Sequence, residues 1–165
     1  MDGGTLVRLA KMVLIGAITM AAVPSAAQKI DPKQFTVPVY RGPRARPDFT
    51  GEGKQYLYYR TAISNGFKEN PIAAGHYVVI TVGCGTSCTF HWVGDVRAGK
   101  IMPFPVGGED YPQTEIITQP DARLVIVKWG DYGDNDCHAR LYALTNGQFQ
   151  QIGPDKHKGS GCDVR

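Results

Sequence analysis

Short apolar and alternating runs fill the second half of the chain, and this pattern predicts β-strands. His76–Val82 carries apolar residues on both faces, as a strand buried on both sides does, and Arg123–Trp129 is the clearest core strand. Four other runs have strand character: Thr89–Asp95, Lys100–Phe104, Ala139–Leu144 and Phe149–Ile152. The pattern therefore predicts about six strands.

The turns between these runs favour antiparallel hairpins. Arg97-Ala98-Gly99 supplies a glycine where a left-handed residue is needed, and Asn146-Gly147 is a strong signal for a two-residue hairpin. With that turn, the apolar residues Leu144 and Phe149 lie opposite each other, which supports the register. We expect a mainly β fold, an antiparallel meander.

A helical spacing of apolar residues precedes the strands, in Gln55–Asn65. Leu57, Tyr58, Ala62 and Ile63 would share one face, and Asn65-Gly66 follows as a C-terminal stop. We therefore expect one short N-terminal helix, and a single antiparallel β domain over residues 54–165.

Residues 1–27 have the character of a signal peptide. Arg8 and Lys11 precede the apolar run Met12–Val23, and small residues follow before a cleavage point at Gln28. An uncleaved anchor is the alternative, but this run of 12 residues is short of the ~20 needed to span a bilayer. We expect a periplasmic or secreted protein with no stable membrane insertion.

Residues 28–53 predict an extended, basic, proline-rich arm. Its cations up to residue 47 are opposed only by Asp31, and four prolines interrupt the stretch: Lys29, Lys33, Arg41, Arg44 and Arg46, with Pro32, Pro38, Pro43 and Pro47. Prolines at this density block helix and ladder hydrogen bonds, so we expect the arm to be partly disordered. It is either a solvated leader or a basic tether for anionic envelope surfaces.

The overall charge argues against nucleic-acid binding. The chain has 18 basic and 15 acidic residues, a net charge of +3. Loss of Arg8, Lys11 and Asp2 with the leader changes these counts to 16 and 14, a net of +2. That balance, without a basic stripe interleaved with aromatics, does not suit a nucleic acid.

Four cysteines suggest disulfides in an exported protein. The turn-forming residues Gly85, Thr86 and Ser87 allow Cys84 to reach Cys88, and a Cys137–Cys162 bridge would fix the C-terminal tail. A redox-active Cys84/Cys88 pair is an alternative, although such pairs usually have a two-residue spacing at a helix start. A zinc site of Cys84, Cys88, Cys137 and His138 is another alternative. We expect no metal and no cofactor.

Other candidate chemistry is weak. Asp131–Asp136 resembles a calcium loop but lacks the EF-hand alternation of oxygen ligands followed by a glycine and a distal glutamate, so an acidic turn is the favoured interpretation. His76 and His91 would face each other near the cysteine hairpin, where packed histidines are commoner than catalytic ones.

The loops supply candidate binding residues. The proline- and glycine-rich segment Met102–Thr114 predicts a long surface loop. Exposed aromatic side chains on loops are common anchors of protein recognition. The predicted binding residues are Phe104, Tyr111 and Tyr132, with Thr86 and Ser87 of the cysteine turn.

Ala74-Gly75-His76-Tyr77 followed by Gly83–Cys88 resembles a motif of small exported proteins of Gram-negative bacteria. Matching later pieces are Asp95–Lys100, Asp121–Val125 and Tyr142–Gly147. Val82 stands where that group tends to have tryptophan. The group has no settled activity, so the resemblance implies compartment and fold only.

These observations favour a non-catalytic exported binding or inhibitor module with an envelope protein as its partner. A disulfide-stapled sheet that presents loops is sufficient for that function. The alternative is a small envelope enzyme or thiol oxidoreductase that uses Cys84, Cys88 and the nearby histidines.

Overall fold

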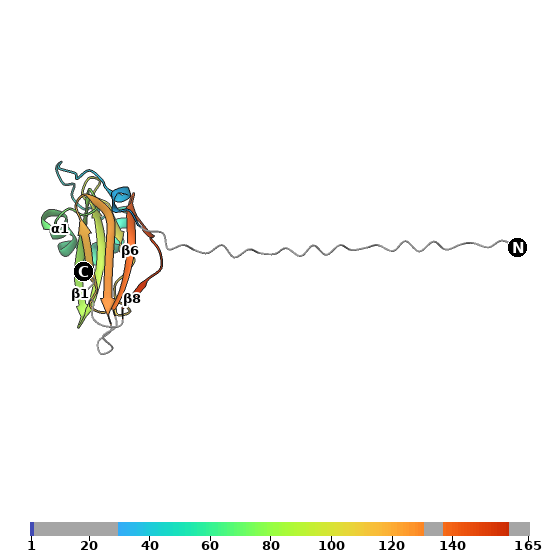
Figure 1. The fold of residues 1–165 in the computed structure, drawn as a ribbon. Coiled ribbons are helices and arrows are strands. Elements are labelled where there is room, and N and C mark those ends of the chain that lie inside the picture. Colours follow the sequence, from blue (N-terminus) through green and yellow to red (C-terminus); the bar gives the residue numbers. More distant parts are fainter. Residues whose placement is uncertain (2–29, 131–136, 159–165) are drawn as a thin grey trace. The chain divides into compact units, whose positions relative to one another are not determined.

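The computed structural model describes residues 1, 30–130 and 137–158, and the unit discussed below begins at Asp31. It contains two antiparallel sheets (Figure 1). The first has the order β1-β2-β3: β1 (Tyr77–Gly85), β2 (Cys88–Asp95) and β3 (Ile101–Pro103). The second has the order β4-β5-β6-β7: β4 (Glu115–Gln119), β5 (Ala122–Gly130), β6 (Cys137–Thr145) and β7 (Gln148–Gln151), with β8 (Lys156–Lys158) also paired to β6.

The expectation of a mainly β, antiparallel, disulfide-containing fold is confirmed, with eight strands in the described residues rather than about six. Two strands were missed. β4 is only five residues long and borders the proline-rich segment. β8 contains no apolar residue, so no hydrophobic periodicity marks it as a strand. It pairs with β6. Arg140 of β6 also forms an ion pair at 2.5 Å with Asp155, the residue just before β8.

The predicted hairpin details also hold. Leu144 pairs with Phe149 across the Asn146-Gly147 turn. Gly99 has φ 77°, the left-handed conformation expected for its place in the turn between β2 and β3.

The helical segment is longer than predicted and has a different buried face. Short 3₁₀ helices cover Pro32–Phe35 (η1) and Gly51–Tyr59 (η2), and helix α1 spans Arg60–Glu69. Ile63 is buried as expected, and Tyr56 and Phe67 are buried with it. Leu57 and Tyr58, expected on the buried face, are exposed because the apolar residues that follow the helical period are Tyr56, Tyr59, Ile63 and Phe67. Gly66, predicted to lie at the stop, is buried within α1 against Ile80.

Two apolar layers hold the unit together. One lies between the sheets and includes Tyr77, Val93, Val125, Val127 and Trp129. The other lies between the helices and the opposite face of the β1–β3 sheet: Tyr56, Ile63, Phe67, Val78, Ile80, Trp92, Val96 and Ile101. The architecture is therefore a helical layer on a two-sheet sandwich, with α1 on the side away from β6 and β8 (Figure 1).

The basic arm is extended, but from Thr36 onward it is attached to the domain. Backbone hydrogen bonds join it to loops and strand ends at four points: Val37 N to Asp121 O (2.8 Å), Tyr40 N to Gly75 O (2.7 Å), Ala45 N to Val96 O (2.7 Å) and Asp48 N to Gly99 O (2.8 Å). These bonds give partners to backbone N–H groups that have no helix or sheet partner within the proline-rich arm itself. The expectation of a partly disordered leader separate from residues 54–165 is therefore wrong for residues 36–48.

Candidate functional site

The cysteine hairpin closes as predicted. Cys84 and Cys88 form a disulfide with a Cα–Cα distance of 5.0 Å, between the end of β1 and the start of β2. The register changes from Gly83 opposite Thr89 to Gly85 opposite Cys88, so Cys84 is an extra residue in a β-bulge. Cys84 is exposed and Cys88 is buried. The bridge therefore clamps a bulged turn between strands, rather than a helix start.

The other cysteine expectations have different outcomes. Cys137 is buried at the start of β6, whereas Cys162 lies outside the described residues, so their pairing stays a prediction. The zinc alternative is wrong as a four-ligand set, because Cys84 and Cys88 are bonded to each other. In the part of the chain that the structure describes, no group of three or more His, Cys, Asp or Glu side chains is placed to hold a metal ion.

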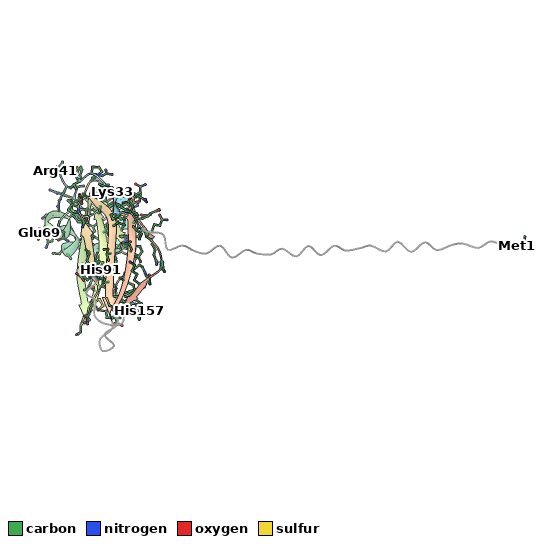
Figure 2. All side chains as sticks on the ribbon, viewed as in Figure 1. Met1, Lys33, Arg41, Glu69, His91 and His157 are labelled. Atoms are coloured by element: carbon green, nitrogen blue, oxygen red, sulfur yellow. A yellow bond between two sulfur atoms is a disulfide. The ribbon has the colours of Figure 1, made fainter. Side chains whose placement is uncertain are left out.

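The two strand histidines do not face each other. His91 pairs with Thr81 of β1, five residues after His76, which immediately precedes that strand. Both His91 ring nitrogens lie 2.9 Å from threonine hydroxyls, Nδ1 from Thr81 and Nε2 from Thr89. Burial lowers the pKa of His91 to about 4. His91 is therefore a neutral, hydrogen-bonded core residue, well inside the unit (Figure 2).

His76 lies at the open end of the same strand pair. Its Nε2 is 3.6 Å from Asp95 Oδ2. Burial lowers the pKa of His76, and the carboxylate of Asp95 only partly opposes this effect. Because His76 lies next to Asp95, at the end of β2 away from Cys88, it is distant from the cysteine hairpin.

The three aromatic residues predicted to bind a partner differ in their exposure and in whether the structure describes them. Phe104 is only 8% exposed and packs edge-on against Phe149 in the core, so it is unavailable to a partner. Tyr111 is half-buried and packs edge-on to Trp129 at 5.2 Å. Tyr132, with the whole acidic turn Asp131–Asp136, lies outside the described residues.

The turn residues Thr86 and Ser87 are joined to the proline-rich segment. Thr86 is exposed, whereas Ser87 is half-buried with φ 62°. The Ser87 carbonyl accepts a hydrogen bond from Gln113 N at 3.0 Å, and Thr89 O accepts one from Gly108 N at 2.8 Å. The cysteine turn and the Met102–Thr114 segment are thus neighbours and could belong to one binding surface. Fewer of their predicted binding residues are exposed than expected.

The most exposed aromatic side chain of the described residues lies elsewhere, on η2. Tyr58 is 90% exposed. Its ring packs edge-on against Tyr59 at 5.0 Å, and Tyr59 packs against buried Trp92 at 4.5 Å. Phe90, 42% exposed, lies two residues before Trp92 on the same face of β2. We call Leu57, Tyr58, Tyr59 and Phe90 the aromatic surface.

Sequence reasoning missed this surface because it chose the wrong helical phase. A face through Leu57 and Tyr58 left Tyr56 outside, although Tyr56, Tyr59, Ile63 and Phe67 follow the helical period better. If Tyr56, Tyr59, Ile63 and Phe67 are taken as the buried face, the helical period places Tyr58 toward solvent.

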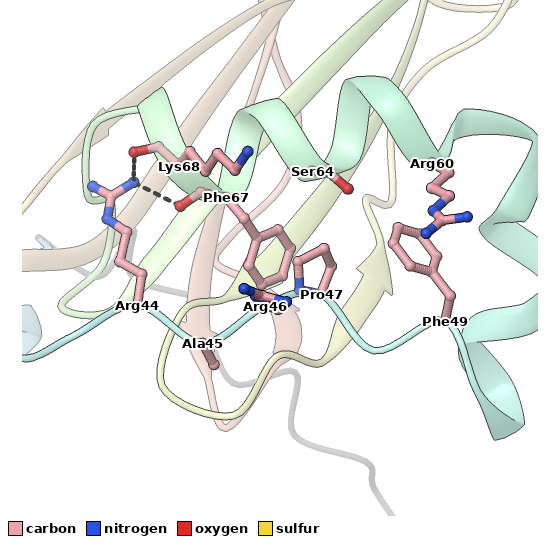
Figure 3. A pocket seen from close by; sticks show the side chains of 9 residues that line it. All are labelled: Arg44, Ala45, Arg46, Pro47, Phe49, Arg60, Ser64, Phe67 and Lys68. Carbon is pink, nitrogen blue, oxygen red and sulfur yellow. Dashed lines mark hydrogen bonds between the residues drawn. The ribbon is translucent and has the colours of Figure 1, made fainter.

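A basic groove lies beside α1 (Figure 3). It has a volume of about 470 Å³, with the arm as one wall and α1 as the other, and its lining residues are Arg44, Ala45, Arg46, Pro47, Phe49, Arg60, Ser64, Phe67 and Lys68. Arg44 Nη1 donates to three carbonyls at the end of α1, those of Phe67 (2.9 Å), Lys68 (3.1 Å) and Asn70 (2.9 Å). This residue fixes the distance between the two walls.

Comparison with protein-family models, curated proteins and solved structures finds no match for this chain. Within the described residues, no helix has the length and hydropathy needed to cross a bilayer.

Proposed function

We propose that this chain is an exported, non-catalytic binding or inhibitor module that recognises an envelope protein through the aromatic surface. The observation that carries the proposal is the exposure of Tyr58, at 90%, on a helical segment anchored to the core through Tyr59 and Trp92. Export rests on the signal-peptide pattern of residues 1–27 and on the resemblance to small exported proteins.

Exposed aromatics on a fixed support suit protein recognition. Tyrosine offers a large contact area with little side-chain entropy to lose, which is why it is enriched at interface hot spots. Leu57 on η2 and Phe90 on β2, 49% and 42% exposed, add exposed apolar side chains on the helical side of the β1–β3 sheet. Tyr59 packs between Tyr58 and Trp92, and this support reduces the side-chain entropy that Tyr58 would lose on binding.

The thiol oxidoreductase alternative is favoured by one observation, the exposure of Cys84. Its partner Cys88 is buried, an asymmetry that would let an external thiolate attack Cys84 first. The binding function is better supported, because the bridge lies in a strand bulge without a helix start to stabilise a thiolate.

Affinity capture from the periplasm of the producing cell tests the proposal. The wild type is compared with Tyr58→Ala and with Ile126→Ala, which truncates an apolar side chain 37% exposed on the second sheet. We expect Tyr58→Ala to reduce a specific captured protein at least tenfold and Ile126→Ala to leave it unchanged. Equal capture by all three, together with disulfide reductase turnover that Cys84→Ser abolishes, would favour the oxidoreductase.

A further inference from the structure

Three cations at the basic groove have no ion-pair partner among the residues that the structure describes. Arg46, Arg60 and Lys68 are exposed, and none of them forms an ion pair or side-chain hydrogen bond with another described residue. Arg44 differs, because the carbonyls at the end of α1 already occupy one of its nitrogens. A cluster of unpaired positive charge around a concave surface favours an anionic ligand.

The cations are spread along the groove rather than gathered at one point. Arg60, Ser64 and Lys68 follow each other at four-residue intervals on the arm-facing side of α1 (Figure 3). The eight-residue separation of Arg60 and Lys68 corresponds to about 12 Å along a helix. A single phosphate group would contact both only if the two long side chains turned toward each other along α1. An extended peptide, at about 3.3 Å per residue, reaches both with carboxylates three or four residues apart.

The lining of the groove is apolar between these charges. Phe67 is buried, and Pro47 and Phe49 are half-buried on the arm side. An apolar side chain midway between the two carboxylates would pack there and lose contact with water. Between the charged ends, the groove thus offers the apolar surface of Pro47, with Arg46 and Ser64 beside it (Figure 3).

We propose that the basic groove binds an extended acidic segment of the partner protein, with two carboxylates three or four residues apart that pair with Arg60 and Lys68, and an apolar residue between them. This inference rests on the proposed binding function. The groove and the aromatic surface share η2 and α1, since Tyr58 lies two residues before Arg60, so one partner would contact both.

A synthetic peptide tests the groove directly. The probe is a fluorescein-labelled nonapeptide with two glutamates four positions apart and a phenylalanine midway, and its reference carries glutamines instead. Binding is followed by fluorescence anisotropy at physiological ionic strength, where charges interact over about 8 Å. We expect the glutamine peptide to bind at least about tenfold more weakly.

Two double charge reversals separate the groove from overall charge. Arg60→Glu with Lys68→Glu should weaken binding of the acidic peptide at least about tenfold. Lys33→Glu with Lys156→Glu makes the same change in net charge on η1 and β8, and should leave binding within about twofold. Circular dichroism shows whether the charge-reversal variant is folded. If it is not, the neutral variant Arg60→Gln with Lys68→Gln replaces it, and this variant should also weaken peptide binding.

The results separate this inference from the proposed function. Equal weakening by both reversals, or displacement of the peptide by equimolar inorganic phosphate, overturns the peptide site in favour of general charge attraction or a simple anion site. A wild type that does not bind the peptide overturns it too, and Tyr58-dependent capture would then stand alone. If Tyr58→Ala does not change capture of the partner, while peptide binding still depends on Arg60 and Lys68, the proposed role of the aromatic surface is wrong and the groove proposal stands.

Discussion

The ring of Phe67 on α1 occupies the space directly above Gly94 on β2. A β-carbon on Gly94 would overlap three carbons of that ring, and Phe67 is only 1% exposed. The missing side chain lets α1 approach the β1–β3 sheet closely. That approach sets the positions of the aromatic surface and the basic groove, both of which depend on the helical layer.

Gly94→Ala should therefore destabilise the protein. Overpacking of a filled core typically costs about 1–3 kcal/mol, and we expect a loss in that range in urea unfolding. Gly83→Ala, on β1, is the matched control because a β-carbon there meets nothing within 4 Å. Equal stability of the two variants would show that α1 can move away from the sheet without cost.

Arg44→Ala should also lower stability, by about 1–2 kcal/mol, because it removes hydrogen bonds to the last carbonyls of α1 and a positive charge at the helix C-terminus. The measurement is the urea midpoint at constant slope. Arg41→Ala removes another exposed arginine of the arm that makes none of these bonds, and it should stay within about 0.5 kcal/mol of wild type. A similar loss in both variants would mean that Arg44 contributes only general charge.

His91 predicts a loss of stability in acid. Burial lowers its pKa from 6.5 to about 4, so between these values the unfolded chain binds a proton that the folded protein does not. Stability from this residue is complete above pH 6.5 and is lost as the pH falls toward 4, by up to about 3 kcal/mol.

Unfolding free energies of the wild type and His91→Gln across that range provide the measurement. We expect a shallower dependence on pH in the variant, although it is less stable at pH 7. His76, whose pKa burial also lowers, is present in both proteins, so the difference isolates His91. Parallel curves would contradict the assignment of a buried neutral ring.

The Cys84–Cys88 bridge should act as a staple. Its short loop predicts a loss of about 2 kcal/mol in Cys84→Ser with Cys88→Ser, because little chain entropy is removed by closing a few residues. The binding function predicts that partner capture persists below the melting temperature of this variant. Loss of capture in a folded variant would point to the thiols instead.

The sequence predicted the hairpins well because their signals are local. Asn146-Gly147 determines the turn, and the register then places Leu144 opposite Phe149. β8 depends on pairing with β6, and the attachment of the arm depends on carbonyls such as that of Val96, far away in the chain. Such long-range backbone bonds leave no periodic pattern in the segment that makes them.

The candidate site was less predictable for a related reason. Phe104 and Tyr58 are both aromatic residues in segments rich in glycine or polar residues, yet one is buried and the other almost fully exposed. The difference arises from the packing of Phe104 against Phe149 of β7 and from the helical phase that buries Tyr56. Arg60 and Lys68 have no ion-pair partner among the described residues, and such cations are recognised only when the surrounding charges are placed in space.

Site-specific photo-crosslinking in the producing cell tests the central claim most directly. A photoreactive phenylalanine analogue replaces Tyr58 in one variant and Ile126 in the other, two exposed apolar positions on opposite sides of the sandwich. The account predicts that irradiation joins one defined envelope protein to position 58 and not to position 126. Adducts of the same kind and amount at both positions, or none at position 58, would contradict it.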